Sequence, residues 1–181
     1  MIILVRVRNV IQARCRLPGY EKGWFEVDSV DYGVSNTRPG ADRPDNARGL
    51  ASLNELVISK SADGATPELM FQCCQGAPNF SVEIQMVETA KGGKANFPFL
   101  MLRFEDTFAS QWSLGLTTSG TTETVNFDYK RLAIVYYRTK DGFDYERVGP
   151  KGWDTSLDVD GNPGTSWPYA FKARGDVQLG E

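Results

Sequence analysis

Apolar and polar residues alternate with a period of two along most of the chain, a pattern that favours strands with one buried and one polar face. The clearest example lies in segment 80–86, where every second residue is apolar: Phe80, Val82, Ile84 and Met86. The other segments of this kind are 3–8, 24–34, 53–60, 99–104, 110–116, 125–130 and 132–137. We therefore expect a mainly β fold of about seven to nine strands, an antiparallel barrel or two-sheet fold.

Two of these segments have special features. Residues 99–116 predict one long, bent strand or a pair of strands. After Tyr129 the apolar residues change parity, and Leu132 continues on the opposite one. Such a change indicates a bulge, or a strand that passes from one burial environment to another.

A single helix is predicted at about 66–75. Thr66 offers a hydroxyl for the N-cap, Pro67 suits the first helical position and Glu68 places an acid in the first turn. An apolar stripe follows at helical spacing, formed by Leu69, Met70, Cys73 and Cys74. Gly76 stands where a C-terminal cap glycine belongs.

Length and composition argue for one domain over residues 1–181 and against several function classes. The chain has 20 basic and 23 acidic residues and a net charge of −3, without the basic excess of a dedicated nucleic-acid binder. It has no histidine, which removes the commonest general base and metal ligand. No catalytic, cofactor-binding or metal-binding residues can be assigned, and we expect the protein not to be an enzyme.

Cysteine spacing and hydropathy add two expectations. Cys15, Cys73 and Cys74 have no C-x-x-C spacing, so we expect reduced thiols and neither a zinc site nor a disulfide framework. The longest apolar runs, 1–5 and 132–137, are far too short to cross a membrane, and the first is too short for a secretion leader. We expect synthesis in the cytoplasm without a cleaved signal, and no membrane partner.

The order of these motifs resembles the Hcp family (hemolysin-coregulated protein), the tube protein of bacterial type VI secretion systems, over about residues 2–158. The matching segments are 25–35, 56–60, 65–76, 80–86, 92–93, 99–106, 123–137 and 152–154. In segment 65–76 a Thr-Pro start and a closing glycine resemble the helix of the family. Segment 9–23 has no clear counterpart, and residues 161–181 form a C-terminal extension past the usual end of the family.

The resemblance implies a structural and carrier role. Members of the family form hexameric rings that stack into a hollow tube, which a contractile sheath drives out of the cell behind a spike protein. The expected partners are therefore copies of the chain itself, sheath, baseplate and spike proteins, and effector proteins carried in the lumen. Secretion through the type VI apparatus follows from the same resemblance.

The extended loop 36–50 is the candidate for contacts between stacked rings. It carries both charge signs, on Arg38, Asp42, Arg43, Asp45 and Arg48. Mixed charge gives register and orientation more than net affinity, which suits a tube that assembles on demand. The alternative is a solvated hairpin tip.

The family forms its channel from sheets of the ring, so one parity of several strands is expected to face the lumen. A wet, non-adhesive wall favours the polar parity, and the candidates are Ser81, Glu83, Gln85, Asn126, Asp128 and Lys130. The alternative is that these residues face the outer solvent.

Two other functions remain open at this point. A tail-tube protein of a phage or another contractile particle shares the same physics. A free-standing, ligand-binding β-barrel would instead use Trp153, Trp167 and Tyr169 as an aromatic platform, although core packing is the more common use of such residues.

Overall fold

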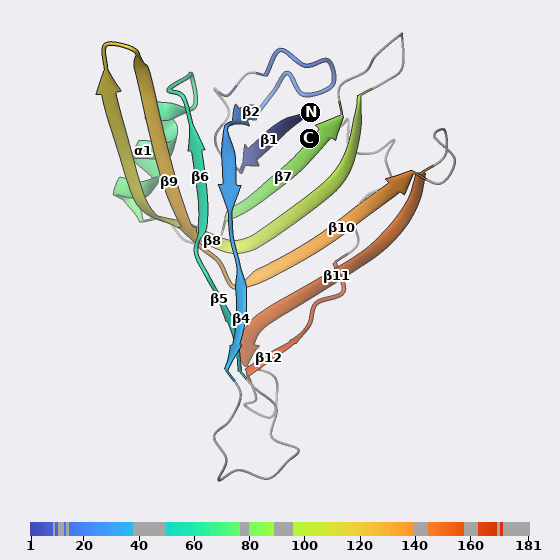
Figure 1. Ribbon diagram of the computed structural model, residues 1–181. Coiled ribbons are helices and arrows are strands. Elements are labelled where there is room, and N and C mark those ends of the chain that lie inside the picture. The colour runs from blue at the N-terminus through green and yellow to red at the C-terminus, as the bar shows by residue number, and fades with distance from the viewer. Residues whose placement is uncertain are drawn as a thin grey trace.

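Figure 1 shows the computed structural model of the chain. It describes residues 1–8, 10, 13, 15–37, 50–76, 80–88, 96–139, 145–157, 163–169 and 171. Its helix in these ranges is α1 (Thr66–Gln75). The strands are β1 (Ile2–Val7), β2 (Trp24–Val27), β3 (Ser29–Asp31), β4 (Val34–Thr37), β5 (Leu50–Leu53), β6 (Leu56–Lys60), β7 (Phe80–Glu88), β8 (Phe97–Thr117), β9 (Gly120–Asp128), β10 (Arg131–Thr139), β11 (Tyr145–Leu157) and β12 (Pro163–Ser166). The expected antiparallel, mainly β fold with one short helix is confirmed.

The strands form two layers that share β8. The large sheet has the order β12-β11-β10-β8-β7-β1-β2, and the small sheet has the order β3-β6-β9-β8. Within the part of the chain that the structure describes, strands β4 and β5 pair only with each other and form an arm that points downward in Figure 1. The layers enclose one main core, to which the helix contributes Ala65 and Leu69.

Strand β8 is long and bent, as the sequence predicts. Up to Thr107 it pairs with β7, and from Phe108 it pairs with β9. The bend lies at Asp106, whose φ of 51° falls in the left-handed region that Asp tolerates better than most residues. Its carboxylate accepts hydrogen bonds of 3.1 and 2.6 Å from the Arg131 guanidinium, which fixes the start of β10 beside the bend.

At two places in the sequence the apolar residues change from odd-numbered to even-numbered positions, after Val27 and after Tyr129. At both places the chain crosses from one layer to the other. Residues 24–34 were expected as one strand, but they form β2 in the large sheet and β3 in the small sheet, divided at Asp28. Residues 125–137 likewise form β9 in the small sheet and β10 in the large one, joined by Tyr129 and Lys130. The second change is therefore a transfer between burial environments and not a bulge.

The helix occupies the predicted residues, with one correction at its start. Gly76 caps its C-terminus at a φ of 57°, and its N–H donates to the carbonyls of Gln72 and Cys73. The N-cap, however, is Ala65 without a side-chain cap, so the assignment of that role to Thr66 is wrong. The Thr66 hydroxyl instead donates to the buried Glu123 carboxylate at 2.6 Å.

Tyr129 supplies a test of the core. Burial raises its pKa to about 12, from an ordinary value of 10, with a smaller contribution from Tyr32. A pKa raised by folding means that the native chain holds this proton more tightly, so stability should fall as the pH rises from about 10 through 12. Urea unfolding at pH 7, 10 and 11 should show this loss in the wild type and a smaller loss in Tyr129→Phe.

The comparison at pH 7 serves as the control. The Tyr129 hydroxyl is buried and has no hydrogen-bond partner among the described residues, so Tyr129→Phe should leave stability there unchanged or slightly higher. If the wild type and Tyr129→Phe lost equal stability between pH 7 and pH 11, the loss would not come from Tyr129.

Candidate assembly surfaces

The outer face of the small sheet is mainly polar, with Val57 on β6 as an apolar member. Directly opposed residues form one row of hydroxyls, Ser29, Ser59, Thr124 and Ser113, in the order β3, β6, β9 and β8. The next row is Asp31, Val57, Asn126 and Gln111. On the opposite face the intervening row is apolar and consists of Val30, Ile58, Val125 and Trp112. One face thus builds the core, and the other presents short polar side chains.

This outer face is uncovered by the rest of the described chain. Ser29, Asp31, Gln111 and Ser113 are exposed, and their neighbours on β6 and β9 are half-buried. The helix packs on the other face, because Leu69 belongs to the main core. In Figure 1, α1 accordingly lies behind β9 and the end of β8.

The small sheet also has two unpaired edges within the described residues. Strand β3 pairs only with β6, and the distal part of β8 pairs only with β9. Unpaired N–H and C=O groups on an edge strand are a template for pairing with another chain. The two edges carry different sequences, so contact between them would be head to tail.

One end of the polar face carries an acidic cluster. Glu55 accepts hydrogen bonds from Asn126 at 2.8 Å and from Ser110 at 3.0 Å. Desolvation, and then the nearby Glu55 charge, raise the pKa of Asp128. Lys130 lies in the connection between β9 and β10 and is exposed. Of the lumen candidates on this side, Asn126 and Asp128 therefore belong to the uncovered face, and Lys130 lies just beyond it.

The lumen candidates on β7 lie on a different surface, the outer face of the large sheet. Tyr20 donates to the Gln85 side-chain oxygen at 2.8 Å, and Gln85 is fully buried. Ser81 is 7% exposed. Glu83 is half-buried between Arg6 at 2.8 Å and Arg103 at 3.4 Å. A channel-lining role stays a prediction for these three residues, but Ser81 and Gln85 have little or no surface with which to contact channel contents.

A row of alternating charges continues from Glu83 across the large sheet. Arg103 reaches Glu105 at 3.3 Å, and Arg131 lies 2.6 Å from Asp106 and 3.9 Å from Asp154. Desolvation acts to lower the pKa of Arg131, but the hydrogen bond and charge of Asp106 prevail and raise it. This row ties together β8, β10 and β11 by charge.

The C-terminal aromatic residues cover this row. Trp167 lies over the Arg131 guanidinium at 5.4 Å and Tyr169 over Arg103 at 5.8 Å. The backbone N–H of Trp167 donates to the Gly152 carbonyl at 3.0 Å. A Cβ on Gly152 would lie 2.5 Å from the backbone carbonyl oxygen of Trp167. The bare backbone of Gly152 therefore allows the close approach of this segment. Trp167 and Tyr169 pack against the barrel, which weakens the case for a ligand platform.

Other predicted features lie outside the described residues or add no chemistry. Arg38, Asp42, Arg43, Asp45 and Arg48 are not among the described residues, so their stacking role stays a prediction; the β4–β5 pair that leads to them is described. The three cysteines are free. No cluster of three metal-ligating side chains is found in the described ranges. Among these same residues, no helix has the length and hydropathy needed to span a membrane.

Sequence reasoning missed the hydroxyl row of the small sheet. Its members come from four strands, and the alternation shows only that each has a polar side. Which polar sides share one surface is decided by strand register, here Ser59 beside both Ser29 and Thr124. Alternation in β6 and β9 was visible in the sequence, but their pairing was not.

Several solved structures share this fold of two antiparallel sheets and a helix. A solved structure described as a type six secretion system protein has a TM-score of 0.73 and 23% identity, covering 91% of this chain and 99% of that one. Hcp1 from Salmonella typhimurium has a TM-score of 0.63 and 15% identity, with 84% and 93% covered. A type VI secretion system effector from Yersinia pestis has a TM-score of 0.61 and 13% identity, with 84% and 98% covered.

The family model described as "Type VI secretion system effector, Hcp" matches residues 15–136. The chain belongs to the Hcp family. Members of this family are structural tube proteins of type VI secretion rather than enzymes, and they are secreted by that system. No curated protein was found to match the chain.

Proposed function

We propose that the chain forms hexameric rings that stack into the hollow tube of a type VI secretion system, with the outer face of the small sheet lining the channel. The observation that supports this role is the uncovered hydroxyl row on a sheet with two unpaired edges. If the β8 edge of one copy lies beside the β3 edge of the next, Ser113 continues the row into Ser29. Repetition around a closed ring would give a continuous inner wall.

The chemistry of this face suits a conduit. Ser29, Ser59 and Thr124 hold water through short side chains that present neither large apolar area nor long charged groups for cargo to adhere to. Effector proteins would travel within this wall, and the sheath would contact the outside of the tube. The chain would be made in the bacterial cytoplasm and would leave through the apparatus, with baseplate and spike proteins as further partners.

Assembly of the purified protein tests the proposal. We expect ring-shaped particles in negative-stain electron micrographs and a hexameric mass by light scattering at micromolar concentration. A monomer at every dilution, with no rings, would contradict the proposal. A ring of copies in which the small-sheet face points outward would keep the assembly and overturn the assignment of the channel wall.

A further inference from the structure

The core-facing side of the large sheet extends beyond the small sheet that covers it. One row of directly opposed residues on this side is buried, and it consists of Val5, Ile84 and Leu102 with the half-buried Ile134 beyond them. The neighbouring row toward the far end of the sheet is equally apolar and consists of Ile3, Met86, Leu100, Tyr136 and Val148. We call this second row the apolar row.

Exposure along the apolar row rises away from the small sheet. Ile3, Met86 and Leu100 are half-buried, whereas Tyr136 is 44% and Val148 46% exposed. The Phe99 ring meets the Tyr136 ring edge-on at 6.2 Å and widens the surface. A seven-stranded layer thus faces a four-stranded one, and the apolar row is exposed at its β10 and β11 end.

The second exposed apolar surface is the outward side of α1. Phe71 is 57% and Met70 37% exposed, and Cys74 is exposed with its Sγ 3.5 Å from the Met70 sulfur. The inward side of the same helix buries Leu69 in the main core. We call Met70, Phe71 and Cys74 the helix patch.

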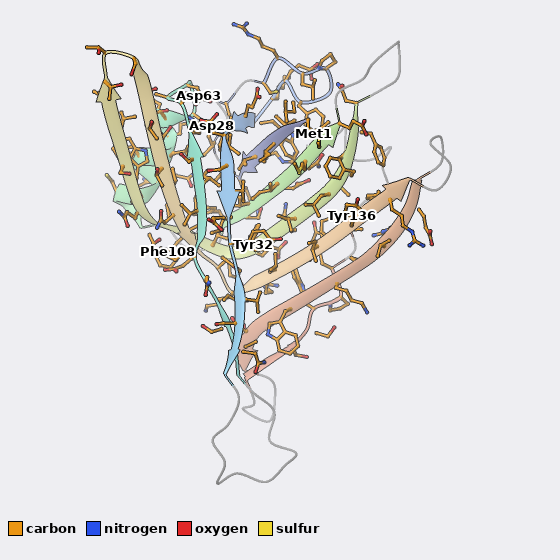
Figure 2. The ribbon with its side chains drawn as sticks, in the orientation of Figure 1. Met1, Asp28, Tyr32, Asp63, Phe108 and Tyr136 are labelled. Carbon is orange, nitrogen blue, oxygen red and sulfur yellow. The ribbon has the colours of Figure 1, made fainter. Side chains whose placement is uncertain are left out.

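The two surfaces lie on opposite sides of the molecule. In Figure 1, α1 stands at the left beside the small sheet, whereas β10 and β11 reach out to the right. Figure 2 places Tyr136 on β10, on that right-hand side. Two different apolar surfaces on opposite sides are what a head-to-tail ring of identical subunits requires.

We propose that the helix patch of one copy packs onto the apolar row of the next copy around the ring, an inference that rests on the proposed function. The small-sheet edges support this pairing. The helix contacts β8, whose distal part forms one edge of the small sheet. The apolar row begins at Ile3, which opposes Val27 on β2, and β2 is followed by β3, the other edge of the small sheet. Because α1 packs on the core side of its small sheet, joining β8 to β3 of the next copy would place α1 on the side of that copy's large sheet that carries the apolar row.

Charge near the two surfaces agrees with the same pairing. Lys151 is exposed and opposes Ile134, so it lies on the face of the large sheet that carries the apolar row. The first turn of α1 carries Glu68, and its last turn carries no basic residue. Attraction between Glu68 of one copy and Lys151 of the next would favour this orientation.

Disulfide crosslinking tests the contact directly, because α1 already carries an exposed thiol at Cys74. In a Cys15→Ser, Cys73→Ser background, Val148→Cys should form disulfides between copies under mild oxidation. The expected result is a ladder of covalent species up to the hexamer on a non-reducing gel. Adding Cys74→Ser should abolish the ladder.

Arg147→Cys is the matched control, because Arg147 is exposed on the same strand but opposes Tyr137 on the other face of the sheet. It should give no ladder. Rings that form in micrographs but crosslink equally through positions 147 and 148, or through neither, would overturn this contact and leave the proposed function standing. A chain that forms no rings overturns both.

Discussion

Glu123→Ala is expected to lower the free energy of unfolding by about 3–5 kcal/mol, the usual cost of breaking a buried ion pair by removing one of its members. Glu123 has no exposed surface and its carboxylate lies 2.7 Å from the ammonium of Lys60, which is 1% exposed. The same carboxylate accepts hydrogen bonds from the Thr66 hydroxyl at 2.6 Å and from the Trp112 indole at 2.7 Å. Removal of Glu123 therefore leaves the Thr66 hydroxyl and the Trp112 indole without this acceptor, and it leaves the Lys60 ammonium with Asp63 at 2.7 Å as its one remaining carboxylate.

Glu146→Ala is the matched control. Glu146 pairs with Arg138 at 2.6 Å, but the two side chains are 47% and 61% exposed. Exposed pairs of this kind contribute about 0–1 kcal/mol. Denaturant unfolding of the two variants should differ by several-fold in the loss of free energy. Similar losses would show that the buried network does not hold α1 and the small sheet together.

The buried network left a signal in the sequence that alternation alone could have revealed. Extending the buried parity of β6 from Leu56 and Ile58 reaches Lys60, and extending that of β9 backward from Val125 reaches Glu123. Two opposite charges on apolar parities at strand ends suggest a buried pair. Their partnership follows only from the register, in which Lys60 lies opposite Glu123.

The sequence predicted those elements whose structure depends mainly on residues close together in the chain. The helix at 66–75 and the long, bent strand through Phe104 follow from spacing and periodicity within a few residues. The strands β11 and β12 were missed because Gly149, Pro150 and Gly152 interrupt the alternation of β11. Those glycines serve close approaches to other segments, such as Trp167 over Gly152, that only the folded chain displays.

The predicted lumen residues divided for a similar reason. Segments 81–85 and 126–130 have the same alternation of polar and apolar residues, so the sequence treats their polar sides alike. The folded chain covers Gln85 with Tyr20 and leaves Asn126 on an uncovered sheet. The covering residue, Tyr20, lies in segment 9–23, for which the sequence showed no clear counterpart, whereas the family model matches the chain from residue 15. Alternation therefore identifies the polar side of a strand, but it does not show whether another segment covers that side.

Phe104→Ala is the second variant for which we expect a large effect, a loss of about 3–5 kcal/mol in the free energy of unfolding. Phe104 has no exposed surface and lies between the rings of Tyr32 and Tyr129, at centroid distances of 5.6 and 4.8 Å with edge-to-face geometry. Tyr129 joins β9 to β10, where the chain crosses between the layers, and Tyr32 lies between β3 and β4, so the ring of Phe104 packs against both connections. Truncation would leave a cavity that the two flanking aromatic rings can fill only by moving the chain at these connections.

Phe71→Ala removes the same side chain from an exposed position on α1, where Phe71 is 57% exposed. In the isolated subunit this control should change stability by no more than about 0.5 kcal/mol. Denaturant unfolding at concentrations below ring assembly separates the two effects, because Phe71 would matter only when a second copy covers it. A Phe104→Ala loss as small as that of Phe71→Ala would mean that the barrel interior relaxes around the cavity and that the layers are not held by this aromatic cluster.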